Sequence, residues 1–213
     1  SSARRRQLLE HAARHDAVII EDDYDSESNF TLNPLPALKA SDRSGRVVYV
    51  SSLSKALSPG LRLGFMVADP DLIDEARALR RLVYRHPPTN IQYQMAHFLA
   101  QGHYETHLRR YHYDSAQRWE RLHAALQRYL PSCRALAGSE HANAFWLQTP
   151  AQINTQQLTW RAAHAGVLIE PGARHFLSAA PPDNYFRMGF HAINPDAIAQ
   201  GVEVLRGQLE QMG

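Results

Sequence analysis

The chain has 213 residues, of which 44% are hydrophobic and 21% charged, with a formal net charge of +2 at pH 7; this composition is typical of a globular protein. No apolar run approaches the ~18 residues that a membrane span needs, the N-terminus does not resemble a signal peptide, and no basic stripe marks a DNA-binding surface. The single cysteine, Cys133, excludes an internal disulfide and a cysteine metal cluster, and fits a reducing, cytoplasmic setting.

The first predicted element is a helix over residues 3–15, in which Leu8 and Ala12 share one face. A short apolar strand follows at residues 16–20. A helix that starts with the chain and leads directly into a buried strand is typical of the middle of a domain, and Ser1 is not methionine. We therefore expect the chain to be a fragment of a longer protein.

Two further strands are predicted at residues 47–50 and 62–68. Polar side chains follow the first two strands: an acidic run at residues 21–25 after the strand 16–20, and a serine-rich stretch at residues 51–55 after the second. Ligands collect at the carboxyl ends of parallel strands. The pattern therefore indicates the edge of an α/β active site.

Residues 72–85, 90–101 and 104–129 have the spacing of helices, and Asp69 with Pro70 marks the start of the first. The third helix is long, with arginines between its apolar positions. A membrane or DNA-contacting helix is one interpretation, but the pattern favours a solvated helix that joins two domains.

His103 and His107 lie four residues apart on this helix, which is a possible spacing for a pair of metal ligands. No third ligand joins them at a convincing spacing. We therefore predict no metal site, and we assign the two histidines to a solvated or interface helix.

The pattern changes at about Pro131 to short strands and turns, which predicts a smaller α+β domain. The predicted elements are strands at residues 144–147, 167–169 and 186–190 and helices at residues 155–165 and 195–211.

Lys55 is one of only two lysines, beside Lys39, in a chain with 23 lysine and arginine residues together. An arginine does not give up its proton, whereas a partly desolvated lysine can become a nucleophile and condense with a carbonyl. Lys55 follows Ser52 and Ser54 and precedes Arg62, so hydroxyls, an amine and a guanidinium gather after one strand. This combination indicates a site for a phosphorylated aldehyde.

Asp22 and Tyr24 point to the same side of an extended chain, so they can face one ligand together. Each candidate also has a plain structural interpretation. Asp22 could cap a strand, Tyr24 could be a buried aromatic with a satisfied hydroxyl, and Arg62 could form a surface ion pair. The serines could simply be hydrogen-bonded within the loop. The combination of residue types and their spacing favours the ligand site.

Three motifs carry a resemblance to a known family: EDDYDSE at residues 21–27, SLSK at residues 52–55 and PGLRLG at residues 59–64. They resemble the aminotransferase-like domain of MocR-type bacterial transcription regulators. In that branch of the GntR superfamily, a winged helix-turn-helix is fused to a fold-type I, pyridoxal-phosphate-dependent aminotransferase module. The similarity spans essentially the whole chain and is densest between residues 19 and 65.

The resemblance implies an α/β fold, a fragment of the PLP-dependent transferase fold (fold type I). Residues 1–100 would be the C-terminal part of the large cofactor-binding domain, with part of its sheet and flanking helices and truncated on its N-terminal side. Residues 101–130 would be a long connecting helix, and residues 131–213 a small C-terminal α+β domain. The missing half would contribute further cofactor contacts, so we expect impaired cofactor binding by this fragment alone.

The resemblance also implies a role for each candidate residue. Lys55 would form the internal aldimine with pyridoxal 5'-phosphate. Asp22 would pair with the pyridine nitrogen and keep the ring protonated as an electron sink. Tyr24 would hydrogen-bond the 3-oxygen of the ring. The phosphate would be held by Ser52, Ser54 and Arg62.

Two arginines in the second half are candidates for binding the carboxylate of a substrate or effector. The motif FRMGF at residues 186–190 resembles the strand whose arginine, here Arg187, grips the α-carboxylate in many aminotransferases. The motif PGARHF at residues 171–176 matches a loop in which a MocR-type GABA sensor places its carboxylate-binding arginine, here Arg174. The two arginines compete for one role or share it.

The function implied is an effector-sensing domain that binds pyridoxal phosphate on Lys55 and an amino-compound effector as an external aldimine, with no net turnover. The alternative is an aminotransferase of the aminoadipate or kynurenine type, and a third possibility is an interaction module that has lost the cofactor. The resemblance further implies a homodimer, no membrane contact, and DNA contact only through a winged helix-turn-helix absent from this chain. It does not identify the effector.

Overall fold

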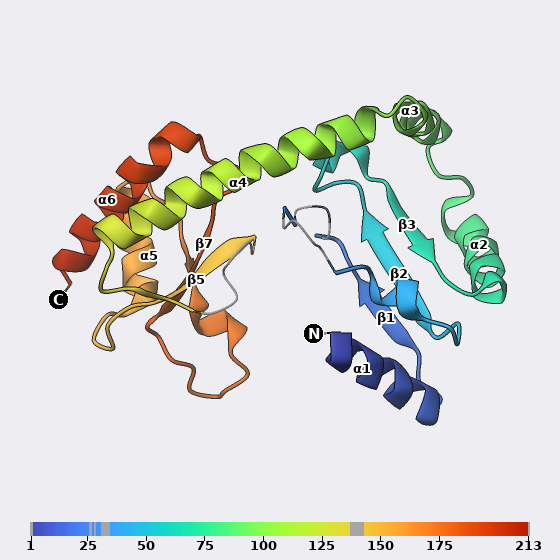
Figure 1. Ribbon diagram of the computed structural model, residues 1–213, viewed down its shortest axis with the longest axis horizontal. Helices are drawn as coiled ribbons and strands as arrows, with labels where there is room; N and C mark the ends of the chain where they lie inside the picture. Colours follow the sequence, from blue (N-terminus) through green and yellow to red (C-terminus); the bar gives the residue numbers. More distant parts are fainter. Residues whose placement is uncertain (1, 26, 28, 31–34, 137–142, 213) are drawn as a thin grey trace. The chain divides into compact units, whose positions relative to one another are not determined.

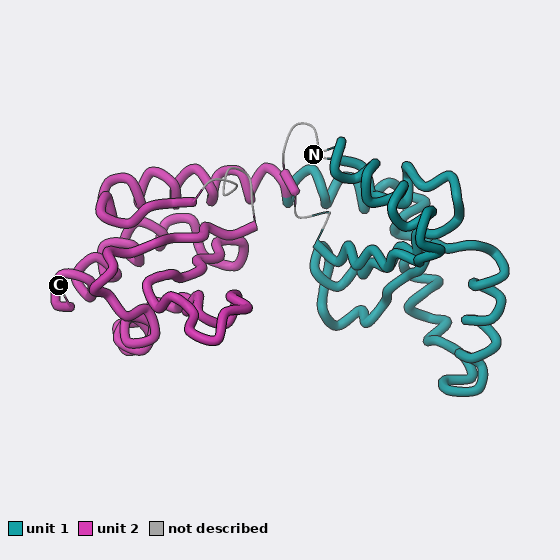
Figure 2. Tube along the Cα trace, turned by 90° about the horizontal axis from the view of Figure 1, so that it is seen from below, with its two compact units in different colours: residues 1–28, 32–111 teal, residues 29–31, 112–213 magenta. Residues whose placement is uncertain are grey.

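The computed structural model describes residues 2–25, 27, 29–30, 35–136 and 143–212 (Figure 1). The chain divides into two compact units (Figure 2). Each unit contains a sheet of its own. Unit 1 comprises residues 1–28 and 32–111, and unit 2 comprises residues 29–31 and 112–213. Within the described part of the chain, no helix has the length and apolar character that crossing a membrane would require.

Unit 1 contains a three-stranded sheet with the order β1-β2-β3. Strand β1 (Ile19–Asp22) runs parallel to β2 (Val47–Ser52), and β3 (Gly64–Val67) runs antiparallel to β2. Helix α1 (Ser2–Arg14) precedes β1. Val47 is fully buried, as expected for a β-branched residue in a central strand. The parallel pairing brings the carboxyl ends of β1 and β2 to the same edge of the sheet.

Three helices follow this sheet: α2 (Pro70–Tyr84), α3 (Thr89–Ala100) and the long helix α4 (His103–Tyr129). Asp69 caps α2, because its carboxylate accepts a hydrogen bond of 3.1 Å from the backbone N–H of Asp71. Helix α4 begins in unit 1 and continues into unit 2.

The apolar core of unit 1 is small, with Leu53, Met95 and Tyr104 as its buried cluster. Other apolar side chains of this unit are exposed, including Ile20 at 72% and Leu82 at 85%. Unit 1 therefore presents apolar surface that its own elements do not cover.

A buried carboxylate fixes the entry to β2. Asp42 accepts hydrogen bonds from the backbone N–H of Val47 (2.8 Å) and of Ser44 (3.0 Å), and it forms an ion pair with Lys39 (3.2 Å). Burial acts to raise the pKa of Asp42, but the hydrogen bonds from Val47 and Ser44 outweigh it and hold the pKa well below its usual range.

Unit 2 contains a four-stranded antiparallel sheet with the order β4-β5-β7-β6. Residues of β7 alternate: Phe186 and Met188 are buried in the core, and Arg187 lies on the opposite face. Helix α4 contributes Leu122 and Leu126 to this core, so it is not solvated along its whole length. The remaining elements are β4 (Arg134–Ala135), β5 (Ala144–Gln148), α5 (Thr155–His164), β6 (Glu170–Pro171), β7 (Tyr185–Gly189) and α6 (Ile198–Glu210).

The prediction of a strand at residues 167–169 is wrong. The backbone N–H of Val167 still donates to the carbonyl of Ala162 (2.8 Å) at the end of α5, and Leu168 is 85% exposed. Pairing starts only at Glu170, opposite Arg187. The two-residue strand β4 was not predicted, and the three-part division into domains stays a prediction.

Candidate functional site

The carboxyl end of β1 is fastened to β2. Asp22, the last residue of β1, pairs with Val50. The backbone N–H of Asp23 donates to the carbonyl of Val50 (2.9 Å), and the hydroxyl of Ser51 donates to the carbonyl of Asp23 (2.9 Å). Asp22 itself is exposed. The predicted ring-binding carboxylate thus stands at a fixed strand end and is open to a ligand.

Lys55 lies in the turn that follows β2, and the structure brings it next to Tyr24. The Nζ atom of Lys55 is 4.9 Å from the centre of the Tyr24 ring and forms an ion pair with Asp25. The side chains of Lys55 and Asp25 are only 26% and 27% exposed. Sequence reasoning missed Asp25, because an acidic run gives no signal of which carboxylate reaches the amine.

The two predicted serines lie in the same turn. The hydroxyl oxygen of Ser52 accepts a hydrogen bond from the backbone N–H of Ser54 (3.1 Å). The O–H of Ser52 therefore remains available as a donor. The backbone N–H of Leu53 donates to the carbonyl of Leu63 (3.1 Å), which attaches the turn to the segment that leads into β3.

The start of α4 contacts the Lys55 turn. His107 Nε2 donates to the carbonyl oxygen of Ala56 at 2.6 Å, and Tyr104 packs against Leu53. Burial, and then hydrogen bonding to Glu27, raises the pKa of Tyr104 above its usual range. Sequence reasoning treated His107 only as a possible metal ligand or a solvated residue and missed this contact.

No group of three histidine, cysteine, aspartate or glutamate side chains could hold a metal ion in the part of the chain that the structure describes.

Arg62 follows a short 3-10 helix, Pro59–Leu61, and its backbone is left-handed with φ 49° and ψ 37°. A residue other than glycine in this region is uncommon and is held at a cost of about 1 kcal/mol or more. Arg62 is exposed. The Leu53–Leu63 hydrogen bond places this arginine's segment beside the Lys55 turn.

The two candidate carboxylate-binding arginines lie in unit 2, whereas the Lys55 set lies in unit 1. Arg187 Nη1 donates to Glu170 Oε2 at 3.2 Å, and Arg174 Nη1 lies 3.6 Å from Glu170 Oε1. The structure therefore brings Arg174 and Arg187 to one carboxylate. Glu170 was missed, because its place opposite Arg187 depends on a strand register that the sequence does not reveal.

Gly172 explains how the loop with Arg174 approaches the sheet so closely. A Cβ atom at Gly172 would lie 2.7 Å from the carbonyl oxygen of Tyr185 and 2.8 Å from Cη2 of Trp146. At such distances a side chain would force neighbouring atoms to shift, so glycine is favoured at this position.

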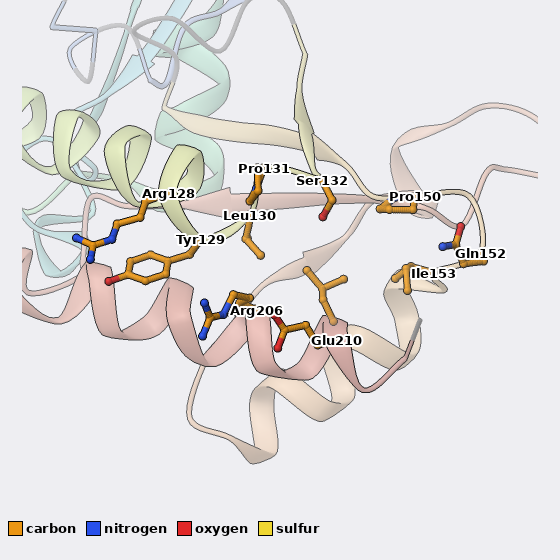
Figure 3. A pocket seen from close by; sticks show the side chains of 11 residues that line it. Arg128, Tyr129, Leu130, Pro131, Ser132, Pro150, Gln152, Ile153, Arg206 and Glu210 are labelled. Atoms are coloured by element: carbon orange, nitrogen blue, oxygen red, sulfur yellow. Dashed lines mark ion pairs between the residues drawn. The ribbon is translucent and has the colours of Figure 1, made fainter.

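A pocket of about 420 Å³ opens beside the arginines and is lined by Trp146, His175, Phe176 and Arg187. A second pocket in unit 2, of about 380 Å³, lies between the end of α4, α6 and residues 150–153 (Figure 3). Arg206 on its rim is 3.6 Å from Glu210, and no predicted site residue lines it. The pocket beside Arg187 is therefore the one that bears on the predicted site.

The chain matches the family of class I and II aminotransferases over residues 3–205 and belongs to it. It is 40% identical over 201 residues to the HTH-type transcriptional regulator TauR of Rhodobacter capsulatus, covering 93% of this chain and 41% of that protein. It is 34% identical over 203 residues to the probable rhizopine catabolism regulatory protein MocR of Rhizobium meliloti, covering 95% and 41%. The predicted resemblance to MocR-type regulators is confirmed, and the chain spans less than half the length of these two relatives.

Solved structures agree on the fold. A multiple substrate aminotransferase from Thermococcus profundus superposes with a TM-score of 0.87 at 28% identity, covering 100% of this chain and 52% of that one. The kynurenine aminotransferase of Pyrococcus horikoshii gives a TM-score of 0.85 at 27% identity, covering 98% and 52%. The predicted α/β fold of the PLP-dependent transferase type, present in part, is confirmed.

Members of this family use pyridoxal phosphate, and the donors in unit 1 fit that group chemically. The Lys55 amine suits an aldehyde, the Asp22 carboxylate suits a pyridine nitrogen and the Tyr24 phenol suits the 3-oxygen. Hydroxyls and a guanidinium suit a phosphate. The phosphate donors would be Ser52, Ser54 and Arg62.

Proposed function

We propose that this chain is the effector-sensing domain of a bacterial, pyridoxal-phosphate-dependent transcription regulator. The observation that carries the proposal is the approach of the Lys55 amine to the Tyr24 ring, at 4.9 Å, where β1 and β2 end. The identity to two regulators along more than nine-tenths of the chain supports regulation rather than catalysis.

In this proposal, pyridoxal phosphate supplies an aldehyde that takes up an amine and a ring that accepts electrons when it is protonated. Lys55 would supply the amine for the aldehyde, and Asp22 would supply the carboxylate for the ring nitrogen. Tyr24 orients the ring through its 3-oxygen. The hydroxyls of the Lys55 turn and Arg62 would bind the phosphate, and the backbone hydrogen bond between Leu53 and Leu63 links their two segments. We also propose that this site is incomplete without further chain, which would impair cofactor binding by these residues alone.

Asp25 has a further consequence for this site. The ion pair with Asp25 occupies the Lys55 amine, which must be free before it can attack a carbonyl. Asp25 therefore keeps Lys55 in place until the cofactor arrives, and the cofactor competes with Asp25 for the amine.

The effector would be an amino compound that takes the place of Lys55 on the cofactor, with its anionic group bound by Arg174 or Arg187. A ligand shifts a conformational equilibrium only by its differential affinity for the two states. The shift would reach DNA through a winged helix-turn-helix outside this chain.

We further propose a cytoplasmic homodimer. Apolar side chains on α2 support a contact with a second copy, since Leu79, Leu82 and Val83 are each more than half exposed. The loop at residues 86–90 and the helices after it are the candidates for the same interface.

The second candidate function is an aminotransferase of the aminoadipate or kynurenine type. It is favoured by the fold similarity to aminotransferases at 27–28% identity and by the complete set of lysine, aspartate and tyrosine. In that case Lys55 would move a proton and Arg187 would bind the α-carboxylate. Turnover of an amino acid with a keto acid at about 1 per second or more would favour the enzyme over the sensor.

The test uses the natural protein that contains this chain. It is incubated with pyridoxal phosphate, reduced with borohydride and digested, and the modified peptide is identified by mass spectrometry. We expect label on Lys55 that is lost in Lys55→Ala. The control is Lys39→Ala, which removes the other lysine and leaves the labelling intact. Label on Lys39 alone, or no label on the folded protein, would contradict the proposal.

A further inference from the structure

Three side chains form a row across the sheet of unit 2. Arg187 on β7 lies directly opposite Trp146 on β5 and directly opposite Glu170 on β6. The neighbouring residues Phe186 and Met188 point into the core, so this row lies on the other face. The strand ladder holds the three side chains in fixed order.

Glu170 is the centre of a charged cluster. Its Oε2 accepts from Arg187 at 3.2 Å, and its Oε1 lies 3.6 Å from Arg174 and 3.4 Å from His175 Nε2. Two guanidinium charges and one carboxylate leave a single net positive charge when His175 is neutral. Arg187 uses only Nη1 in this contact, so its other N–H groups remain for a ligand.

We propose that Glu170 determines the charge of the anionic group that the effector presents: it restricts the Arg174–Arg187 site to a singly charged group and rejects a doubly charged one. The inference rests on the proposed effector site and adds its selectivity.

The reason is electrostatic. A ligand anion bound to Arg187 in the pocket beside Trp146 lies next to the carboxylate of Glu170. One negative charge is balanced by the net positive charge of the cluster, whereas a second one is repelled by Glu170 without a matching cation. Such a built-in repulsive charge is a common means of excluding the wrong ligand.

Aromatic rings line the rest of this pocket. The ring centres of His175 and Phe176 lie 5.3 Å and 6.0 Å from that of Trp146, so Arg187 is the one permanent cation among the four lining residues. The singly charged groups that fit are a carboxylate or a sulfonate, and the excluded class is that of sulfate-like and phosphonate-like dianions.

Methanesulfonate and sulfate test the proposal, because they have the same tetrahedral shape and differ by one charge. Both bind without an amine, so the outcome does not depend on cofactor chemistry at Lys55, which the borohydride experiment tests separately. The natural protein is labelled with 5-fluorotryptophan, the ¹⁹F signal of Trp146 is assigned with Trp146→Phe, and both dissociation constants are measured by titration.

We expect methanesulfonate to bind the unchanged protein more tightly than sulfate. In Glu170→Gln, the dissociation constant of sulfate divided by that of methanesulfonate should fall by about fivefold, as expected for a half-exposed charge pair. Glu210→Gln, which removes the same charge from an ion pair elsewhere in unit 2, should leave the ratio unchanged.

Arg174→Gln gives an independent test at a side chain that is 64% exposed, where folding is not at risk. It removes one positive charge, so the dissociation constant of sulfate divided by that of methanesulfonate should rise. An unchanged ratio in both variants, a preference for sulfate in the unchanged protein, or no response of Trp146 to either anion would overturn the proposal.

Discussion

The two units stabilise their sheets in different ways. Unit 2 encloses a large apolar cluster in which Phe145, Phe186 and Leu158 are at most 1% exposed. Unit 1 has a small apolar cluster, exposes Ile20 and Leu82, and fixes its strands through buried polar contacts. Unit 2 should therefore respond most to lost volume, and unit 1 to lost hydrogen bonds and to protonation.

The largest effect is expected from Phe186→Ala at the centre of unit 2. Removing this fully buried ring should lower the free energy of unfolding by about 3–5 kcal/mol, because a cavity replaces close-packed atoms. Leu168→Ala, at a side chain that is 85% exposed, is the control and should change it by less than about 0.5 kcal/mol. Denaturant unfolding of the natural protein measures the free energy of unfolding of both variants. Similar losses would contradict the prediction that the buried ring contributes far more than an exposed side chain.

Gly172→Ala should destabilise unit 2 by about 1–3 kcal/mol, since the new Cβ meets backbone atoms of Tyr185 that cannot move aside. Gly189→Ala is the matched control, because no atom lies within 4 Å of a Cβ placed there. Thermal unfolding compares the two variants. An equal effect would show that the close approach of the Arg174 loop to the sheet is not fixed.

Asp42→Asn should cost unit 1 about 1–2 kcal/mol at neutral pH, because the amide keeps one acceptor oxygen and leaves either Val47 or Ser44 without an acceptor. The folded-state pKa of Asp42 is depressed, so the unfolded chain binds the proton more tightly. Its stabilising effect is complete above the unfolded pKa of about 3.9 and is lost as the pH falls below it.

Unfolding measured from pH 7 down to about pH 3 tests this sign. The difference in free energy of unfolding between the unchanged protein and Asp42→Asn should become smaller in the acid range. A difference that grows as the pH falls would contradict the assignment.

The smallest expected effect is a gain in the free energy of unfolding. Gly207 lies inside α6, and a Cβ there has no atom within 4 Å. Gly207→Ala should raise the free energy of unfolding by about 0.5–1 kcal/mol, because alanine loses less backbone entropy in a helix. A loss measured by denaturant unfolding would mean that this face of α6 is covered in the natural protein.

The sequence was sufficient for most helices and for the position of β2, because apolar periodicity and caps are local signals. Asp69 at the start of α2 is one such cap. The strand predicted at residues 16–20 lies later, at Ile19–Asp22, so it includes the first two residues of the acidic run. The strand predicted at residues 167–169 failed because the end of α5 takes up the backbone of Val167, which periodicity does not reveal.

The candidate site was predictable where it follows motifs, as for Asp22, Tyr24 and Lys55, although their cofactor roles remain predictions. The partners of those residues were not predictable. Asp25 reaches Lys55 through the path of a loop, and Glu170 reaches Arg187 through strand register. Both depend on three-dimensional placement rather than on any pattern of neighbouring residues.

The hydrogen bond between His107 and the carbonyl of Ala56 has a consequence for the natural variation of this protein. The contact depends on the length of the Lys55 turn and on the position of His107 along α4, although the two segments are distant in sequence. Insertions or deletions in either segment should be rare, or should occur together with a compensating change in the other. A variant at His107 would look remote from the lysine in an alignment, yet it should alter how readily Lys55 reacts.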